Sequence, residues 1–299
     1  MIYKTCLFAS YIKGNEIPKD VKHYLYQLSQ CGWNIHLALS GKTYLTPDIR
    51  NFCKLNNIIP HLRPNEGLDF GAWQYLINKN VTKNSDYILL ANDSVWGPIY
   101  PLQPIFHNML NQKLDVWGLV ESFEVVPHFQ SWFLCLSRKA MDTSKIQRLF
   151  IQQFNKMNKA EIIRNGELKL GNILRQTPSL HYKACWSKGK HCFARDPQQI
   201  NPMHLDWLSI VQSGYVPFIK KELLRDNYYG IFWLNYYHIL MKNNRFFPEH
   251  YITQYLKNCS QRNVPVIPRW KRFLYLVNSY DFKTAWKYIF KAGKNTLVE

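Results

Sequence analysis

Hydrophobic and polar residues follow two alternating patterns along the first half of the chain. Short apolar runs bounded by Gly, Pro, Asn or Asp predict β-strands at residues 4–11, 34–39, 58–62, 87–91, 115–121 and 130–137. Between these runs, apolar residues recur with helical spacing at residues 19–30, 46–55, 71–77 and 102–111. Because strands alternate with helices, we expect an α/β fold with a mainly parallel sheet flanked by helices.

The pattern changes after Arg138. Longer polar helices are predicted at residues 142–157 and 159–175. Residues 179–217 are rich in Pro, His, Trp and Lys, which is typical of loops packed over a site. From Lys220 onward the chain is aromatic and helical in pattern. We therefore expect one domain over residues 1–227, with two halves that divide near residue 121, and a helical, aromatic and basic C-terminal region over residues 228–299.

Length and composition are those of a protein with a sizeable core. The chain has 299 residues, 46% of them hydrophobic, which favours one large domain or one domain with an appendage. Its longest apolar stretches are far shorter than the roughly 20 residues that a transmembrane helix needs. The N-terminus lacks the features of a signal peptide, so a cytoplasmic location is expected.

The formal net charge of +18 predicts an anionic partner. Nucleic acid, anionic lipid and a phosphorylated substrate are the classes to weigh. No zinc finger, basic zipper or ribonucleoprotein-type strand motif occurs in the sequence, so we expect no nucleic acid partner. Residues 262–299 interleave Lys and Arg with aromatic residues, which is typical of a segment at an anionic membrane surface. The alternative for this segment is a helical pair packed on the main domain with solvated lysines.

Residues 63–73 form the most informative segment, because they follow a predicted strand, contain Gly67 and Gly71, and open a helix. Such a turn presents backbone N–H groups and the positive end of a helix to an anion. The alternative is a turn that needs glycine for backbone reasons alone. The sequence leaves both interpretations open.

A second informative segment is Asn92, Asp93 and Ser94, which follow an apolar strand and precede Gly97 and Pro98. Polar groups at the carboxyl ends of strands bind ligands in open α/β folds. An Asp with flanking oxygen atoms suits a divalent cation that bridges diphosphate oxygens. A turn stabilised by Asn and Asp side chains is the alternative.

Six segments together resemble the rhamnan synthesis protein F family of glycosyltransferases. They occur in the expected order at residues 65–73 (NEGLDFGAW), 92–98 (NDSVWGP), 117–122 (WGLVES), 128–133 (HFQSWF), 201–207 (NPMHLDW) and 214–220 (GYVPFIK). The resemblance covers about residues 3–227. That family is similar to the GT-A glycosyltransferases, so the resemblance implies a GT-A-like (Rossmann-like) fold. Residues 1–121 would form the donor half and residues 122–227 the acceptor half.

The resemblance also implies an activity and a cofactor. It points to an inverting rhamnosyltransferase that uses dTDP-L-rhamnose to extend a bacterial surface polysaccharide or lipid-linked glycan, at the inner face of the cell membrane. In GT-A enzymes an Asp-x-Asp motif holds the donor diphosphate through Mg²⁺ or Mn²⁺. Here the matching residues lack the first Asp, so Asp93 is the candidate metal ligand and a metal requirement stays open. The alternative of another class is a non-catalytic protein that binds anionic lipid or nucleic acid.

Inversion requires a carboxylate base near the transferred carbon. Glu167 and Glu121 are near-equal candidates, and Asp69 is the third. Glu167 resembles one member of the GT-A catalytic acid pair, although Leu168 replaces the second acid. The candidate donor-binding residues are Asn65, Gly67, Asp69, Gly71, Asn92, Asp93, Ser94, His204 and Lys220 from the matching segments, together with Arg63 just before the first of them.

Overall fold

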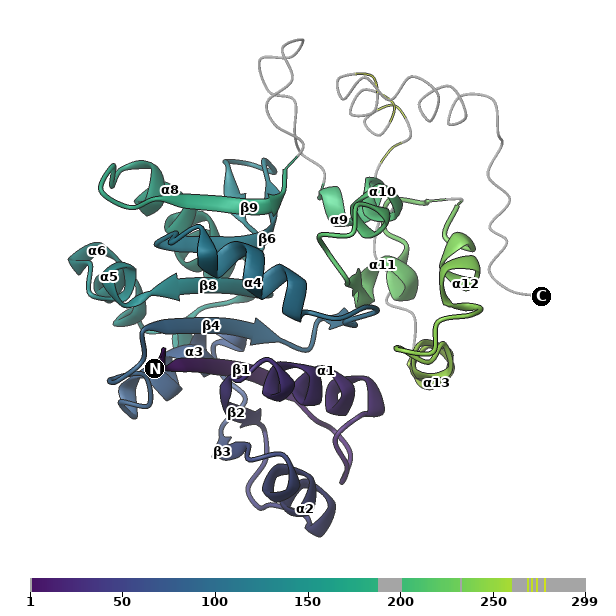
Figure 1. Ribbon diagram of the computed structural model, residues 1–299, viewed down its shortest axis with the longest axis horizontal. Helices are drawn as coiled ribbons and strands as arrows, with labels where there is room; N and C mark the ends of the chain where they lie inside the picture. The colour runs from purple at the N-terminus through teal and green to yellow at the C-terminus, as the bar shows by residue number, and fades with distance from the viewer. Residues whose placement is uncertain are drawn as a thin grey trace.

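A central sheet of eight strands organises the protein (Figure 1). The structure is a computed structural model, and it describes residues 2–187, 201–231 and 233–259 together with Pro268, Trp270, Phe273 and Val277. The strand order is β3-β2-β1-β4-β8-β6-β7, and β9 pairs with β6. The strands are β1 (Lys4–Tyr11), β2 (Asn34–Ser40), β3 (Ile59–Arg63), β4 (Tyr87–Asn92), β6 (Val116–Ser122), β7 (His128–Phe129), β8 (Phe133–Ser137) and β9 (Tyr182–Trp186).

Strands β1 to β4 are parallel, β8 runs antiparallel to β4 and β6, β7 runs antiparallel to β6, and β9 is parallel to β6. The expected fold class, an α/β fold with a mainly parallel sheet flanked by helices, is therefore confirmed. Successive residues of a strand point to opposite faces, so Cys6 and Phe8 of β1 pack into one core while Leu7 and Ala9 pack into the other.

Each face of the sheet is covered by its own helices. One face packs against α1 (Lys19–Gln30), α2 (Pro47–Leu55) and α4 (Gln103–Asn111). The other packs against α3 (Leu68–Asn78), α6 (Ser144–Phe150) and α8 (Lys169–Arg175). The short α5 (Arg138–Met141) precedes α6. Burial on both faces explains why the central strands are nearly continuous apolar runs.

Three sequence expectations differ from the structure. The last strand of the first half begins at Phe133 instead of residue 130, because Gln130 N already donates to Val120 O and Trp132 Nε1 to Gln130. The helix expected at residues 142–157 is α6 followed by the 3₁₀ turn η1 (Phe154–Lys156). Strand β9 lies in the stretch expected to be irregular, where its half-exposed residues give no apolar run.

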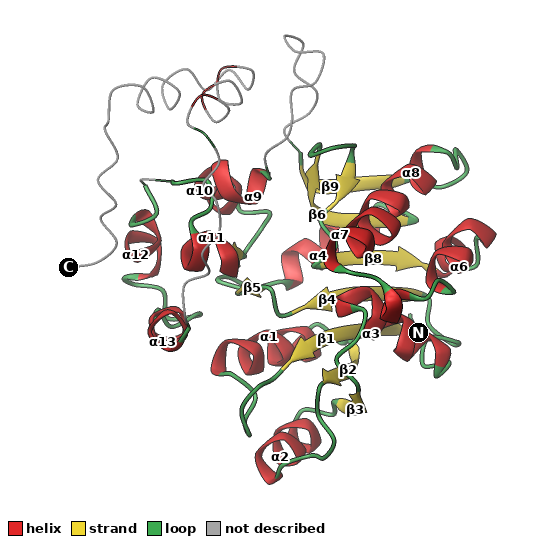
Figure 2. Ribbon diagram, turned by 180° about the vertical axis from the view of Figure 1, so that it is seen from behind, coloured by secondary structure: helices red, strands yellow, loops and turns green. Residues whose placement is uncertain are grey.

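A third core lies beside the sheet and is built from short helices (Figure 2). They are α9 (Pro202–Leu205), α10 (Trp207–Gln212), α11 (Lys221–Asp226), α12 (Tyr236–Met241) and α13 (His250–Asn258). A ribbon of β5 (Val95–Trp96) and β10 (Ile219–Lys220) joins this region to the end of β4. Within the described residues, no helix has the length and apolar character that crossing a membrane requires.

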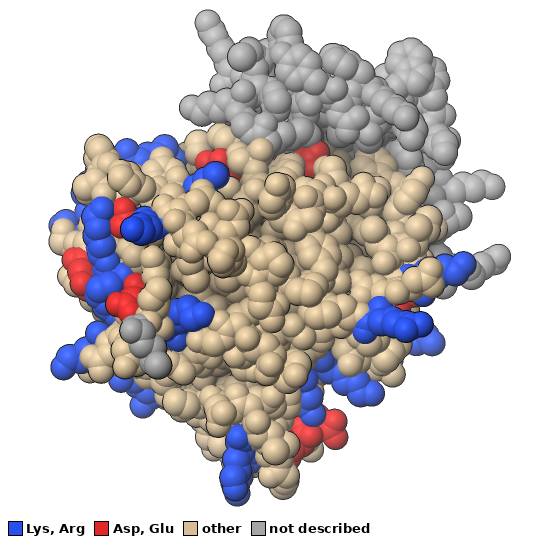
Figure 3. Space-filling view, in the orientation of Figure 1, with Lys and Arg blue, Asp and Glu red and all other residues tan. Residues whose placement is uncertain are grey.

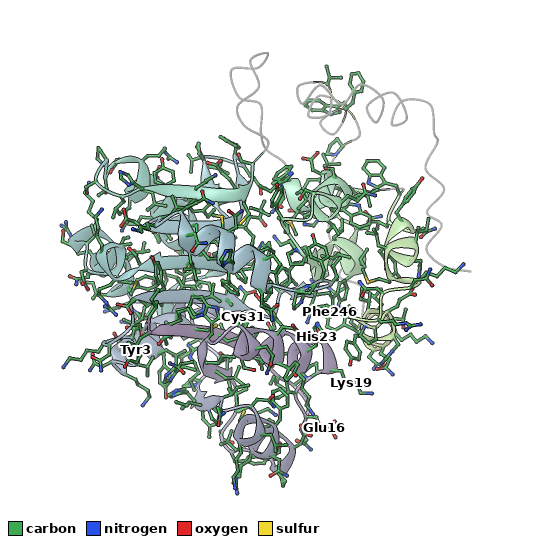
Figure 4. All side chains as sticks on the ribbon, in the orientation of Figure 1. Tyr3, Glu16, Lys19, His23, Cys31 and Phe246 are labelled. Carbon is green, nitrogen blue, oxygen red and sulfur yellow. The ribbon has the colours of Figure 1, made fainter. Side chains whose placement is uncertain are left out.

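Helix α1 also contacts this C-terminal region directly. The rings of His23 and Phe246 meet edge to face, with centroids 5.2 Å apart (Figure 4). His23 Nε2 lies 2.9 Å from Pro98 O, in the segment that follows β5. Burial lowers the pKa of His23, so its ring is a neutral packing partner near pH 7. Helix α1 on the sheet and the C-terminal region therefore share packed side chains in addition to the ribbon.

Candidate active site

Polar side chains gather where the parallel strands end. The sheet register pairs Tyr11 with Ser40, Ser40 with Arg63, and Ala9 with Asn92. The last residues of β1, β2, β3 and β4 therefore lie along one edge of the sheet, which is the usual ligand-binding edge of open α/β folds. We call this the carboxyl edge.

Asp93 is fixed at this edge by hydrogen bonds from β1. Its Oδ2 accepts from Ser10 Oγ at 2.6 Å and from Tyr11 N at 3.3 Å. Burial raises the pKa of the Asp93 carboxyl, and the opposing effects of Lys221 and Ser10 are smaller. Asp93 is thus a partly buried acid held in one orientation at the centre of the edge.

Asp69 lies next to Asn92, whose Nδ2 donates to Asp69 Oδ2 at 2.6 Å. The amide oxygen of Asn92 accepts from Ser94 N and Ser94 Oγ, so the predicted Asn92-Asp93-Ser94 segment is internally bonded. Burial first, and then the negative charges of Asp93 and Glu167, raise the pKa of Asp69 to about 7. This acid is therefore poised to exchange a proton near neutral pH.

The turn that carries Asp69 requires both of its glycines. Gly67 has φ 67°, and a Cβ there would lie 2.9 Å from the backbone of Phe154. A Cβ on Gly71 would lie 2.6 Å from Glu66 O. The glycines thus serve the backbone, which was one of the two interpretations of this segment. Asp69 itself places a carboxylate in the first turn of α3, at the positive end of the helix.

Arg63 is bonded to this turn and stabilises it. Its side chain is 6% exposed, its Nη1 donates to Ser40 Oγ at 2.7 Å, and its Nη2 donates to Glu66 O. These bonds tie the ends of β2 and β3 to the segment before α3. Arg63 therefore holds the carboxyl edge in place. Asn65, in the same turn, is exposed to solvent.

Glu167 approaches the same acids from the acceptor half of the chain. It lies in a π-helical segment, η2 (Ile163–Leu168), between α7 (Lys159–Ile162) and α8, and its Oε1 accepts from Ser131 N at 2.6 Å. Gly166 lets η2 pack on Phe70 of α3, because a Cβ there would lie 2.9 Å from the ring. This contact brings Glu167 close enough for its charge to raise the pKa of Asp69.

Two successive lysines bring positive charge to these acids. Lys221 N donates to Ser94 O at 2.9 Å, so the start of α11 is fixed beside the end of β4. Lys221 Nζ lies 2.6 Å from Asp20 Oδ2, and Lys220 Nζ lies 3.2 Å from Glu222 Oε1. Burial lowers the pKa of both ammonium groups, but the surrounding carboxylates outweigh it, so both pKa values are raised. For Lys221 these carboxylates include Asp93, and for Lys220 they include Glu167.

His204 extends this network into the third core. The side chain is 1% exposed and its Nε2 lies 3.2 Å from Glu222 Oε1. Burial lowers the pKa of His204, whereas Lys220 holds the pKa of Glu222 far below its usual range. The predicted donor-binding residues His204 and Lys220 are therefore joined through one carboxylate, Glu222.

Glu121, the other candidate base, lies elsewhere. Its Oε2 accepts from Ser187 Oγ at 2.6 Å, and the side chain lines a cavity with His128 and Tyr182. Among the described residues, no hydrogen bond joins Glu121 to Asp69 or Glu167. The structure thus brings two of the three candidate bases together and places the third beside a separate cavity.

The residues near Asp93 do not by themselves form a complete metal site. Within the described part of the chain, no three His, Cys, Asp or Glu side chains are grouped as a metal ion would require. Asp93 Oδ2 already accepts two hydrogen bonds, and Lys221 supplies positive charge nearby.

Three side chains of this network were not anticipated from the sequence: Ser10, Asp20 and Glu222. Asp20 follows Pro18 in the first turn of α1, so it has the sequence pattern of an ordinary helix-start acid. Ser10 could have been found by asking which polar residue ends each parallel strand, since the same question identified Asn92. Glu222 is hidden in a charged helix, where acids are usually solvated.

Comparison with known proteins supports a family assignment. Residues 43–284 match the family described as Rhamnan synthesis protein F. The chain belongs to this family. The match includes the ends of β3 and β4, the η2 segment and the two lysines, whereas Ser10, Tyr11, Asp20 and Ser40 lie before its first residue.

Individual relatives are more distant. Virulence protein VirA of Vibrio anguillarum is 29% identical over 193 residues, which is 55% of this chain and 62% of the relative, so less than two thirds of the relative's length is spanned. Core-mannan synthase A of Aspergillus fumigatus is 10% identical, with a TM-score of 0.35 over 56% of this chain and 69% of that chain. The glycosyltransferase GlyE of Streptococcus pneumoniae is 11% identical, with a TM-score of 0.37 over 95% of this chain and 64% of that chain. At these TM-scores the likenesses bear on neither donor nor mechanism.

Proposed function

We propose that this protein is a glycosyltransferase that moves a sugar from a nucleoside diphosphate donor to a glycan hydroxyl. Membership of the rhamnan synthesis protein F family supports this proposal. The observation that carries it is the meeting of Asp69 and Glu167 with Lys220 and Lys221 around Asp93 at the carboxyl edge. Acids for proton transfer and cations for a leaving diphosphate are the two groups that such a reaction needs.

The donor side of the proposal uses Asp93 and the lysines. Asp20 holds the Lys221 ammonium, whose charge acts on Asp93, and Lys220 adds a second positive charge on the side of Glu167. Fixed cations stabilise the charge that develops on the diphosphate as it leaves. Arg63, Gly67 and Gly71 act through the shape of the edge.

The acceptor side uses Asp69 as the base. In an inverting transfer the acceptor oxygen bonds to the anomeric carbon, the bond from that carbon to the diphosphate breaks, and the acceptor proton passes to a carboxylate. A base works best when its pKa lies near the working pH, and Asp69 meets this condition with a pKa raised to about 7. Glu167, held by Ser131 N, contributes the charge that helps to raise it.

The finer identity follows from the family name and from composition. We propose L-rhamnose from dTDP-L-rhamnose as the sugar, and a surface polysaccharide or lipid-linked glycan as the acceptor. Work at the inner membrane face, from the cytoplasm, fits a chain with net charge +18 and a basic aromatic tail. The tail, residues 262–299, lies almost wholly outside the described residues.

A panel of nucleotide sugars tests the activity. Wild-type protein should release nucleotide and form product with one donor, and dTDP should raise its melting temperature. Asp93→Ala should lower transfer more than tenfold with the fold intact. The matched control is Asp142→Ala, which removes only an exposed ion pair with Arg138 and should leave transfer unchanged.

Two results would contradict the proposal. Full transfer by a folded Asp93→Ala variant would remove Asp93 from the donor site. If no nucleotide sugar is consumed and no nucleotide raises the melting temperature, the non-catalytic alternative stands, and binding to anionic lipid or nucleic acid becomes the activity to measure.

A further inference from the structure

An open cavity of about 210 Å³ lies on the acceptor half of the sheet, apart from the carboxyl edge. It is formed where β7 and β9 meet α8. Its walls include Glu121, His128, Phe129, Gly171, Arg175 and Tyr182. None of these residues takes part in the donor network described above.

Close backbone packing builds the cavity. A Cβ on Gly171 would lie 2.6 Å from Pro127 O and 2.9 Å from His128 Cβ, so only glycine lets α8 approach this strand. The guanidinium of Arg175 donates to Pro127 O and to Asn172 Oδ1, which ties the β6–β7 loop to α8. The walls of the cavity are thus fixed by the close packing at Gly171 and by the hydrogen bonds of Arg175.

The lining combines aromatic rings with a few hydrogen-bonding groups. Phe129 and Tyr182 meet edge to face, with ring centroids 6.0 Å apart. Val126 O can only accept, so the 2.7 Å contact places a proton on His128 Nδ1, and in the neutral ring Nε2 is then an acceptor. Glu121 supplies a carboxylate. Rings that cover C–H groups and acceptors that take hydroxyl protons together suit a sugar ring, and the carboxylate disfavours an anionic one.

The cavity lies close to Glu167, the acid whose charge helps to raise the pKa of the proposed base Asp69. Gly171 follows Glu167 by four residues along the continuous helical stretch of η2 and α8, so the two residues lie on neighbouring turns of one side. Glu124 lies within electrostatic reach of both His128 and Glu167, since the charges of both affect its carboxyl. The cavity and Glu167 therefore lie on adjoining parts of the acceptor half.

We infer that this cavity binds a neutral sugar ring of the acceptor glycan, with Glu121 and His128 accepting its hydroxyls and Tyr182 covering its apolar face. This inference rests on the proposed function and gives its acceptor a place. Glu121 is then an acceptor-binding residue, in contrast to the role of base expected from the sequence.

Binding of methyl α-L-rhamnopyranoside to the full-length protein, measured by saturation-transfer NMR, tests the inference. Glu121→Gln and Tyr182→Ala should each weaken binding at least fivefold and raise KM for this acceptor. They should leave the dTDP-induced rise in melting temperature unchanged, because the donor edge is elsewhere. Tyr26→Ala is the matched control, since Tyr26 on α1 is 44% exposed and lies outside the cavity.

The outcomes separate this inference from the proposed function. Unchanged sugar binding in both folded variants, or no sugar signal from wild-type protein that binds dTDP, overturns the acceptor cavity alone. Failure of the wild type to bind any nucleotide counts against the proposed function. Should one variant unfold, the other decides, because the two side chains lie on different strands.

Discussion

Asp69 has two negative neighbours, and this environment predicts its pH behaviour. Its pKa is raised to about 7, so the carboxylate that accepts the proton forms only as pH rises through that value. The transfer rate should therefore increase from pH 6 to pH 8. Asp69→Asn should lower the rate by about 100-fold or more, since general bases contribute at least this much. A pH–rate profile of both proteins checks the prediction.

The same residue should oppose stability. The folded-state pKa lies above the unfolded value of about 3.9, so the native state binds more protons between about pH 4 and pH 7. Its contribution to the free energy of unfolding therefore declines as pH rises through this window. The free energy of unfolding of Asp69→Asn minus that of wild type should therefore be larger at pH 8 than at pH 4. A flat pH–rate profile together with an unchanged stability difference would show that Asp69 is an ordinary structural acid.

Single residues also show how far the sequence could predict the site. Asp69, Asn92 and Asp93 follow predicted strands, so their meeting at one edge could be expected from strand order. Asp20 and Glu222 could not, because they reach the edge from segments about two hundred residues apart, through tertiary packing. Glu121 ends a predicted strand in the same way as Asn92, yet its strand is separated from β4 by β8.

Among the secondary-structure elements, the π-helical segment η2 decides where Glu167 lies. The helix over residues 159–175 could be predicted from apolar spacing, but the π turn inside it could not, since it changes no residue pattern. Such turns often mark functional positions. Gly166 permits the turn to rest against Phe70.

Gly166→Ala tests this element. A methyl group there would favour the helix by about 0.5–1 kcal/mol, but overpacking against Phe70 typically costs about 1–3 kcal/mol, so destabilisation should win. Activity should fall about tenfold as Glu167 moves. Urea denaturation and the transfer assay measure the two effects.

Its controls separate crowding from general disturbance. Gly14→Ala should change neither quantity, since no atom lies within 4 Å of a Cβ there. Adding Phe70→Leu to Gly166→Ala should restore part of the lost stability and part of the lost activity, because the smaller side chain leaves room for the added methyl group. If the double variant is worse than the single one in both assays, crowding against Phe70 is not the cause.

For the whole molecule, the fold class was predictable because the strand and helix patterns of the first half are strong. The helical pattern from Lys220 onward was predictable too, whereas α9 and α10 were not, because they are short and lie in a stretch rich in Pro, His, Trp and Lys. On the face shown in Figure 3, Lys and Arg lie mainly around the margin of the described surface. The division at residue 227 and the membrane role of residues 262–299 stay predictions.

Vesicle binding tests that role. The tail contains eight Lys and Arg residues but only two acids, Asp281 and Glu299. Each basic residue contributes about 1 kcal/mol to the free energy of binding near an anionic surface. Full-length protein should sediment with phosphatidylglycerol vesicles at low salt and be released at high salt. Protein ending at Asn263 should stay in solution. Equal partitioning of the two proteins would assign membrane binding, if any, to the main domain.

The β5–β10 ribbon couples donor binding to the cooperative unfolding of the sheet and the helical region. It holds the segment after β4 against the start of α11, so Asp93 belongs to the sheet while Lys221 belongs to the helical region. A donor that contacts both stabilises only those states in which the two cores are docked. Partial opening of the C-terminal helices would then release the donor before the sheet itself unfolds. The bound nucleotide would hold the sheet and the C-terminal helical region together. Amide hydrogen exchange in α11 would therefore slow when nucleotide binds.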